Sequence, residues 1–392
     1  ALDYLLSRPE ADASRVGVTG NSGGGTLTTY VSALDDRVTM AAPSCFITTF
    51  LCNLENELPA DSEQTPPGIL AAGLDFADYF VAQIPRPLLL LGQENDYFDV
   101  RGLRRTYEEL RRLYRIVGAG DKVGLFVGSH GHGFHADARQ AMYRFFARHS
   151  GRPAAARPSE SRPEEEATLW ATPGGTVLKA GSRNMTVLLK EKARAVEAAR
   201  RSPDGAALKR AIRRVLALPA RRGVAHPARK GAAHYRVLRP RPVGDGRFRS
   251  HSAFAVETEP GIQAVLHLYG AAPYAYLPAR EHAVVFVPHL ASEEDVRDGL
   301  APKKQEVFAV DVRGMGLTRA LTCGVEQFFH PYGSDYMYAV HGQMLGEPYL
   351  GRRVHDLLCV LDLLAANGCR DISLIGRGLG AVTSAFAACL HP

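Results

Sequence analysis

The sequence predicts an α/β protein in which two stretches of alternating strands and helices flank a helical segment. Short β-rich apolar runs separated by helical patterns indicate a parallel sheet covered by helices. This pattern occupies residues 1–150 and returns from residue 233, whereas no strand pattern stands out from 151 to 232. A chain of 392 residues with 46% apolar content is long enough for two or three domains with sizeable cores. We therefore expect domains at 1–150 and 233–392, joined by a linker at 151–232.

The first stretch is expected to hold four strands, which are Arg15–Thr19, Val38–Ala42, Pro87–Leu91 and Lys122–Val127. Helical patterns fall between them, including one at 103–114, and a last helix covers about 136–148. Residues 1–6 read as the middle of an amphipathic helix, and the first residue is Ala rather than Met. We therefore expect the chain to begin inside a longer protein, so that any targeting segment would precede Ala1.

The linker is basic and rich in Pro, Arg and Ala. Residues 151–250 hold 23 Lys/Arg and 8 Asp/Glu, so the rest of the chain is net acidic although the whole carries +6. Neither interleaved aromatic residues nor zinc-ligand spacings accompany this charge, as they would in a nucleic-acid-binding module. We expect a solvated linker that binds no nucleic acid, with helices at 184–200 and 204–218.

The second stretch is expected to hold six strands, which are Tyr235–Leu238, Ala253–Thr258, Gln263–Leu268, Ala283–Val287, Val307–Val312 and Asp371–Ile375. A long helix at 350–367, with its apolar residues on one face, precedes the last strand. The sequence stops at Pro392 inside a helical pattern, so we expect the C-terminus to be cut as well.

A motif for covalent catalysis stands at Gly20-Asn21-Ser22-Gly23-Gly24, which matches G-x-S-x-G between a predicted strand and a predicted helix. In that context the serine occupies a sharp, strained turn, and the small residues let the flanking chain pack closely. The N-terminus of the helix favours the negative charge that develops during acyl transfer. We expect Ser22 to be the nucleophile and the N–H of Gly23 to be an oxyanion-hole donor.

An acid and then a histidine should follow such a serine in the chain. The acid should come directly after a buried strand, and Pro87–Leu91 leads into a segment with three acidic residues. Asp96 is the first choice because it lies closer to the end of the strand than Asp99. Asp99 and Glu94 are the alternatives.

The base should follow the last strand and precede the last helix, where the sequence reads Gly128-Ser129-His130-Gly131-His132-Gly133-Phe134-His135. His132 is the first choice, His130 the second and His135 the third. The His-x-His-x-x-His spacing also fits a metal cluster, but no acidic ligand lies in the same loop. The predicted mechanism requires neither a metal nor a cofactor.

Four segments together carry a resemblance to a known family, and they are Ala1–Leu5, Arg15–Gly24, Ala42–Cys45 and His132–Phe134. They make residues 1–150 similar to the acetylxylan-esterase-like and prolyl-oligopeptidase-like branch of the α/β-hydrolases. The resemblance covers a little over a third of the chain and implies a triad of Ser22, Asp96 and His132. It implies a serine esterase acting on short-chain esters, such as acetyl groups on a carbohydrate, and a serine peptidase is the alternative.

Residues 233–392 resemble the opposite half of the same fold. Residues 306–316 are like its fourth strand and following turn, and 371–380 are like a second elbow with Gly378 at the nucleophile position. Because glycine has no side chain that could attack a carbonyl, we expect a degenerate hydrolase domain here, with a binding or scaffold role as an alternative. The sequence Gly376-x-Gly378-x-x-Ala381 also fits a dinucleotide-binding fingerprint loosely. However, several strands precede it, and no acidic residue follows about 20 positions later.

The chain is thus expected to join the C-terminal half of an active hydrolase to the N-terminal half of a degenerate one. The second oxyanion donor would lie before Ala1, so this piece alone is expected to be inactive. A circular permutation, in which 233–392 completes the first sheet, is disfavoured because the elbow strand would then be present twice. The six cysteines lack a CxxC pattern and are expected to be small core residues.

Neither partners nor location can be assigned closely from composition. No apolar run is long enough for a membrane span, so no membrane partner is expected. The compartment stays open, with a secreted or periplasmic location if a signal peptide precedes Ala1. The oligomeric state and any ligand of the second domain also stay open.

Overall fold

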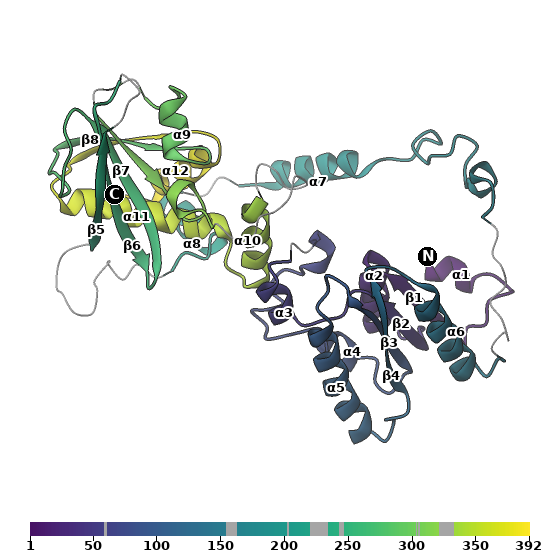
Figure 1. Ribbon diagram of the computed structural model, residues 1–392. Coiled ribbons are helices and arrows are strands. Elements are labelled where there is room, and N and C mark those ends of the chain that lie inside the picture. Colours follow the sequence, from purple (N-terminus) through teal and green to yellow (C-terminus); the bar gives the residue numbers. More distant parts are fainter. Residues whose placement is uncertain are drawn as a thin grey trace. The chain divides into compact units, whose positions relative to one another are not determined.

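The computed structural model describes residues 1–58, 61–153, 163–201, 204–219, 234–242, 247–302, 304, 306–320 and 333–392 (Figure 1). The chain divides into two compact units, of which the larger holds Ala1–Arg152 with Ala211–Pro392 and the smaller holds Pro153–Arg210. The larger unit contains two separate sheets. The class is therefore mixed α/β, as the sequence predicts. The predicted domain boundaries near 150 and 232 remain predictions.

The first sheet has four parallel strands in the order β1-β2-β3-β4. Its strands are β1 (Gly17–Asn21), β2 (Met40–Ser44), β3 (Leu88–Asn95) and β4 (Val123–Gly131). Its helices are α1 (Leu2–Leu6), α2 (Gly23–Leu34), α3 (Phe50–Glu55), α4 (Asp78–Val81), α5 (Val100–Ile116) and α6 (Ala136–Ser150), with a 3₁₀ turn at Ser62–Gln64. Each predicted strand overlaps an observed one.

The four consecutive leucines of β3 explain how this sheet is buried on both faces. Leu88 and Leu90 belong to a core cluster that includes Leu110 of α5, whereas Leu89 and Leu91 belong to another that includes Met142 of α6. Successive side chains of a strand point to opposite faces, so an unbroken apolar run fits a strand covered by helices on both sides. The two clusters hold the carboxyl ends of the strands at one edge of the sheet.

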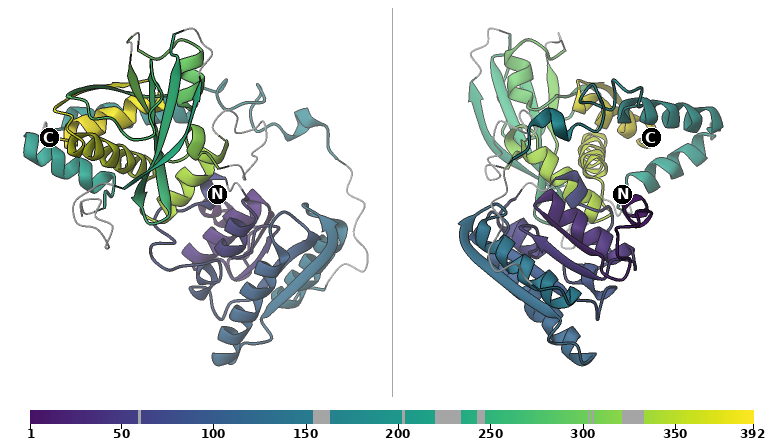
Figure 2. Two further views of the ribbon diagram at one scale, coloured as in Figure 1. Left: turned by 60° about the vertical axis from the view of Figure 1, so that its left-hand side comes forward. Right: turned by 90° about the vertical axis from the view of Figure 1, so that its right-hand side faces the viewer.

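The second sheet has the order β10-β8-β9-β7-β6-β5. Figure 2 shows its green strands in two further views. Strands β10, β8 and β9 are parallel, and β7 runs antiparallel to both of its neighbours, β9 and β6. The strands are β5 (Tyr235–Pro242), β6 (Ser250–Glu259), β7 (Ile262–Gly270), β8 (His282–Val287), β9 (Val307–Asp311) and β10 (Asp371–Gly376). The helices from residue 292 onward are α9 (Ser292–Arg297), α10 (Gly333–Met344), α11 (Tyr349–Ala366) and α12 (Leu379–Leu390), with a 3₁₀ turn at Gly316–Thr318.

Among the described residues, no strand of one sheet is hydrogen-bonded to a strand of the other, which argues against the circular permutation. In that alternative β9 would lie beside β1, but β9 pairs with β7 and β8, and β1 pairs with β2. As predicted, β10 is the last strand of the second sheet in chain order. Both sheets therefore contain their own strand that leads into a glycine-flanked turn.

Charged pairs fix the turn that follows β9. Asp311, 1% exposed, bonds His267 across the sheet at 2.9 Å and accepts hydrogen bonds from the hydroxyl and N–H of Ser292. Arg313 donates to the fully buried Asp356 of α11 at 2.6 Å. Each buried charge thus has a partner, which offsets the large cost of removing it from water.

Helix α10 is an element that the sequence analysis did not predict. The N–H groups of Gly68 and Ala71 donate to the backbone oxygens of Gln343 and Met344 at 2.9 and 3.1 Å. The Met344 side chain, 2% exposed, belongs to the core cluster that also contains Leu88 and Leu90. The burial of this helix therefore depends on residues more than 250 positions earlier in the chain.

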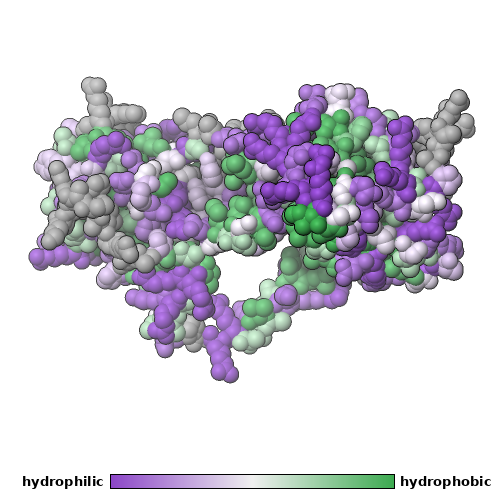
Figure 3. Space-filling view, turned by 90° about the horizontal axis from the view of Figure 1, so that it is seen from below, coloured by the Kyte–Doolittle hydropathy of each residue, from purple (hydrophilic) through white to green (hydrophobic). Residues whose placement is uncertain are grey.

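The smaller unit contains α7 (Met185–Ala199) and a 3₁₀ turn at Glu166–Leu169, and α8 (Gly205–Val215) crosses its boundary. These two helices confirm the predicted helical stretches. All of α7 is exposed, including the apolar residues Met185, Leu188, Leu189 and Val196. Figure 3 shows extensive hydrophilic surface interrupted by smaller hydrophobic areas. Within the described ranges, no helix is both long and apolar enough to cross a membrane.

Candidate active site

Ser22 lies on a strained turn between β1 and α2. Its φ of 58° and ψ of −119° are rare for a residue with a side chain, and such strain is concentrated at functional sites. A Cβ on Gly20 would come within 2.4 Å of the Gly24 backbone, and one on Gly25 within 2.5 Å of the Ser44 oxygen. Glycine is therefore required beside this turn, in agreement with the sequence motif.

Four neighbouring strands each deliver a reactive side chain in the residue that directly follows the strand. Ser22 follows β1, Cys45 follows β2, Asp96 follows β3 and His132 follows β4. The carboxyl ends of parallel strands meet at one edge of the sheet, which is where open α/β sheets form their binding sites. The sequence analysis identified three of these residues and treated the fourth, Cys45, as a core residue.

Asp96 and His132 form a direct pair. The Nδ1 atom of His132 lies 2.9 Å from Oδ1 of Asp96, whose side chain is 2% exposed. The N–H of Phe98 donates to the same Oδ1 at 3.1 Å. Because an ionised carboxylate only accepts hydrogen bonds, the imidazole carries its proton on Nδ1 and leaves Nε2 free to accept another. This is the tautomer that a general base needs.

Tyr97 connects the histidine with the serine, and the sequence analysis missed it. Its ring stacks on that of His132, with centroids 4.2 Å apart and an angle of 26° between the planes. Burial raises the pKa of the Tyr97 phenol, and a hydrogen bond with the side chain of Ser22 opposes this increase. The ring is half-exposed and forms one wall around the imidazole. Its position next to Asp96 in the chain is a local feature, but that position does not specify the contact with His132.

The alternative acids have other partners. Asp99 caps α5 by accepting from the N–H of Arg101 at 2.7 Å, and its side chain also bonds the guanidinium of that arginine. Those hydrogen bonds lower the pKa of the Asp99 carboxyl to about 2. Glu94 forms an ion pair with Arg104 on α5. Among the described residues, neither carboxylate forms a hydrogen bond or an ion pair with His132, whereas Asp96 does.

Replacing Asp99 with Asn should affect stability rather than chemistry. Asn is as good a helix N-cap as Asp, but it loses the charged contact with the Arg101 guanidinium. Because that arginine is largely exposed, the loss is expected to cost up to about 1 kcal/mol. The pKa of Asp99 is about 2 in the folded chain, below its value of ~3.9 in an unfolded one. Its contribution to the free energy of unfolding is therefore fully present above the unfolded pKa. That contribution disappears as the pH falls from about 4 to about 2. Denaturant titrations of native and Asp99→Asn protein should therefore differ at pH 7 and converge near pH 2.

The alternative histidines also form their own contacts. The rings of His130 and His135 stack at 4.4 Å, and Nε2 of His130 lies 3.7 Å from Asp137. The Nε2 atom of His135 lies 3.2 Å from the Gly131 oxygen. Within the described residues, the donor atoms that come close enough for a metal belong to Cys45, Asp96 and His132 instead. The His-x-His-x-x-His spacing therefore does not assemble a metal cluster.

The second elbow has the same backbone as the first but is filled by a side chain. Gly378 has φ 55° and ψ −120°, almost the angles of Ser22. A Cβ at Gly378 would lie 2.2 Å from Nδ1 of His289, and the N–H of Leu379 donates to that same atom at 3.2 Å. This amide corresponds in position to that of Gly23 in the first elbow. The His289 imidazole therefore fills the space that a nucleophilic side chain would need, and it also bonds the amide that would bind an oxyanion.

Gly378→Ser should therefore destabilise the second region without creating an esterase. Overpacking of this kind typically costs about 1–3 kcal/mol, because the ring of His289 would have to move away from the new side chain. Thermal unfolding and ester hydrolysis measure the two effects. Gly205→Ser is a suitable control, because nothing lies within 4 Å of a Cβ there. A stable Gly378→Ser protein with new serine reactivity would contradict this account.

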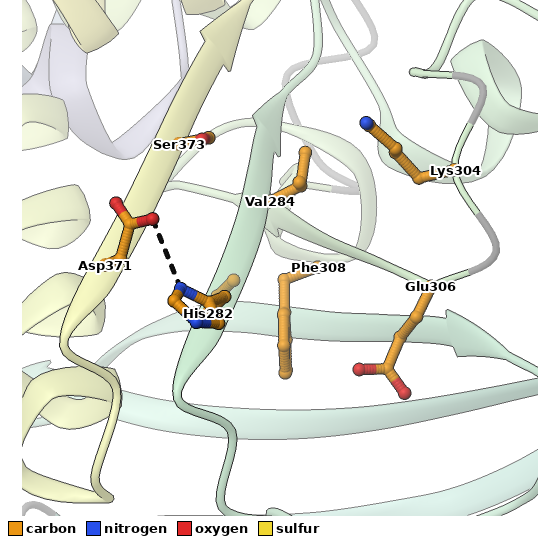
Figure 4. A pocket seen from close by; sticks show the side chains of 8 residues that line it. His282, Val284, Lys304, Glu306, Phe308, Asp371 and Ser373 are labelled. Atoms are coloured by element: carbon orange, nitrogen blue, oxygen red, sulfur yellow. Dashed lines mark hydrogen bonds and ion pairs between the residues drawn. The ribbon is translucent and has the colours of Figure 1, made fainter.

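A hollow of about 420 Å³ on the second sheet also contains serine, histidine and aspartate (Figure 4). His282 on β8 bonds Asp371 on β10 at 3.2 Å, and both side chains are mostly exposed. Ser373 pairs in register with Val284, two residues beyond that pair. Figure 4 shows Ser373 apart from the bonded pair. These three residues therefore do not form a second triad.

Comparisons with known proteins match only part of the chain. No family model matches it. "Putative hydrolase YtaP" of Bacillus subtilis (strain 168) is 27% identical over 153 residues, which are 37% of this chain and 49% of that protein. The chain thus spans about half the length of the curated relative it matches.

Two solved structures also match part of the chain. "Methylesterase BT1017" has 32% sequence identity and a TM-score of 0.31, covering 38% of this chain and 32% of that one. A carbohydrate esterase family 15 (CE15) glucuronoyl esterase from Caldicellulosiruptor kristjansonii has 19% identity and a TM-score of 0.32, covering 42% and 51%. In each comparison, less than half of this chain is matched.

Proposed function

We propose that the first sheet carries the active site of a serine hydrolase that cleaves carboxylic esters. The contact that supports this most strongly is the 2.9 Å hydrogen bond between Asp96 and His132. It occurs at the same sheet edge as Ser22. The strained turn at Ser22 is typical of nucleophile elbows, which expose the serine hydroxyl. These two observations support the roles that we propose for Ser22, Asp96 and His132.

The proposed reaction proceeds through an acyl-enzyme. Ser22 Oγ attacks the ester carbonyl while Nε2 of His132 takes its proton, and Asp96 stabilises the resulting imidazolium. The same proton then passes to the oxygen of the leaving alcohol as the ester bond breaks. A water molecule, deprotonated by His132, hydrolyses the acyl-enzyme and restores the Ser22 hydroxyl. No step uses a metal or an organic cofactor.

The N-terminus of α2 would stabilise the oxyanion. Gly23 is the first residue of α2, so its amide is one of those that have no acceptor within the helix. An oxyanion-hole donor of this kind contributes about 3–4 kcal/mol to transition-state stabilisation. The Tyr97 ring excludes water from one face of the imidazole and restricts its rotation. Both effects support proton transfer in a fixed direction.

For the substrate we propose an ester of a carbohydrate, with acetyl esters first and a peptidase as the alternative. The test is a substrate panel in the presence of a metal chelator. It contains acetylated xylan, a methyl ester, a glucuronoyl ester and an aminoacyl amide, and it uses this chain and a longer form that contains it. Ester cleavage insensitive to the chelator is expected. Cleavage of the amide alone would favour the peptidase, and loss of all activity with the chelator would contradict the mechanism.

We also propose that the second region is a degenerate hydrolase domain without catalysis of its own. The support is the absence of a side chain at Gly378 together with the position of His289. A binding or scaffold role is compatible with both observations. Fluorophosphonate labelling followed by peptide mapping is the test. Adducts are expected in the peptide that contains Ser22, and an adduct on a serine after residue 233 would overturn this assignment.

A further inference from the structure

We propose that Cys45, Asp96 and His132 form a zinc site and that Zn²⁺ bound there inhibits the hydrolase. The inhibition depends on the proposed function, whereas the binding does not. The thiol sulfur, a carboxylate oxygen and a ring nitrogen of these residues all lie within 4.8 Å of one another. Across the ranges that the structure describes, no other trio of His, Cys, Asp or Glu side chains meets this condition.

The fold itself brings the three groups together. Each is the first residue after one of three adjacent parallel strands, β2, β3 and β4. The Cys45 thiol contacts the loop of the histidine through the Gly133 oxygen, at 3.4 Å. Because the loops that carry the three side chains leave a well-packed sheet edge, the site is preorganised and little chain entropy is lost on binding.

The distances suit a tetrahedral zinc ion. Bonds of about 2.3 Å to sulfur and about 2.0–2.2 Å to nitrogen and oxygen place neighbouring donors roughly 3–4 Å apart. The observed limit of 4.8 Å therefore requires only small side-chain shifts. Asp96 Oδ2 is buried and accepts from no N–H or O–H group of a described residue. The Cys45 thiol also bonds this carboxylate, so a metal that replaces the thiol proton would lie between two of its proposed ligands. The His132 side chain is 22% exposed, which leaves solvent access for the ion and a fourth, water ligand.

The ligand set selects the metal. A thiolate with an imidazole and a carboxylate is typical of zinc, whereas magnesium and calcium take oxygen ligands. Binding transfers the thiol proton to solvent, and the imidazole proton moves from Nδ1 to Nε2 as the metal takes Nδ1. With Nε2 protonated, His132 cannot accept the proton of Ser22. Zinc therefore inhibits by holding the base in the wrong tautomer.

Binding is measured first, without substrate. Zn²⁺ is titrated against a chromophoric chelator, and Cd²⁺ serves as a probe because thiolate coordination gives it a charge-transfer absorption. The exposed Cys389 is replaced by Ser in every form. Cys45→Ala and Cys45→Ser should bind Zn²⁺ at least about tenfold more weakly, since even the loss of an outer-shell partner costs that much. Cys52→Ser is the matched control, because Cys52 is equally buried but lies on α3 outside the site.

The outcomes separate the two proposals. One Zn²⁺ per chain and a cadmium band that disappears in both Cys45 variants but persists in Cys52→Ser would support the site. Equal binding by the native and Cys45 forms, or no binding, would overturn it whether or not the chain is an esterase. If the binding is present, micromolar Zn²⁺ should inhibit ester hydrolysis by the native form and by Cys52→Ser. The Zn²⁺ concentration that halves a variant's own rate should be at least about tenfold higher for Cys45→Ala, because this variant binds Zn²⁺ more weakly by the same factor.

Discussion

Replacing Ser22 with Ala is expected to reduce kcat/KM for ester hydrolysis by about 10⁴-fold or more. The change removes the atom that forms the acyl-enzyme, and loss of a triad nucleophile costs several orders of magnitude in rate. Alanine retains the Cβ of serine, so the turn at φ 58° carries the same strain in both proteins. The measurement is ester hydrolysis by whichever form of the protein is active, this chain or a longer one. Fluorophosphonate labelling should disappear in parallel.

The control is Ser14→Ala, which removes an exposed hydroxyl bonded only to Asp12 among its described partners. It should retain both labelling and hydrolysis. Circular dichroism and the unfolding temperature show that the Ser22→Ala fold is intact. A variant at Ser22 with a rate within a few-fold of the native one would refute the nucleophile, whatever the substrate proves to be.

Replacing His132 with Ala is expected to cost about 10³-fold or more, because the serine then has no base. The double variant with Ser22→Ala should be no slower than the worse single variant, since residues that act as a unit are not additive. The His130→Ala protein is the comparison, because that ring stacks on His135 and faces Asp137 rather than Asp96. Its rate should change only a few-fold. If His130 proves indispensable instead, the base is two residues earlier than proposed.

Many of the strands could be predicted because buried strands appear in the sequence as short apolar runs. The four leucines from 88 to 91 must face both sides of a strand, so covering helices were implied before any contact was known. Helix α10 gave no such signal. Its residue Met344 is buried by a cluster around Leu88, and a contact at such a sequence separation leaves no local periodicity.

The candidate site divides in the same way. Asp96 could be chosen over Asp99 because distance along the chain from the end of a strand is a local property. The roles of Cys45 and Tyr97 could not, since each depends on how loops from different strands meet. Cys45 resembles a small apolar core residue in the sequence, and only its position close to Asp96 and His132 supports the zinc-binding role that we propose for it. The stacking of Tyr97 on His132 depends on a rotamer that sequence does not specify.

The nearly identical torsions at Ser22 and Gly378 provide a natural crossover point for recombination. A gene fusion could run from residue 234 to Gly376 and continue at Asn21. The fused chain would then contain the elbow of Ser22 in place of that of Gly378, with the same backbone torsions. In the fused chain a single elbow strand would take the place of both β10 and β1, with β8 on one side and β2 on the other. His289 would need replacement at the junction, because its ring fills the space of the serine side chain. The shared turn geometry would thus allow the two regions to be joined at a single elbow.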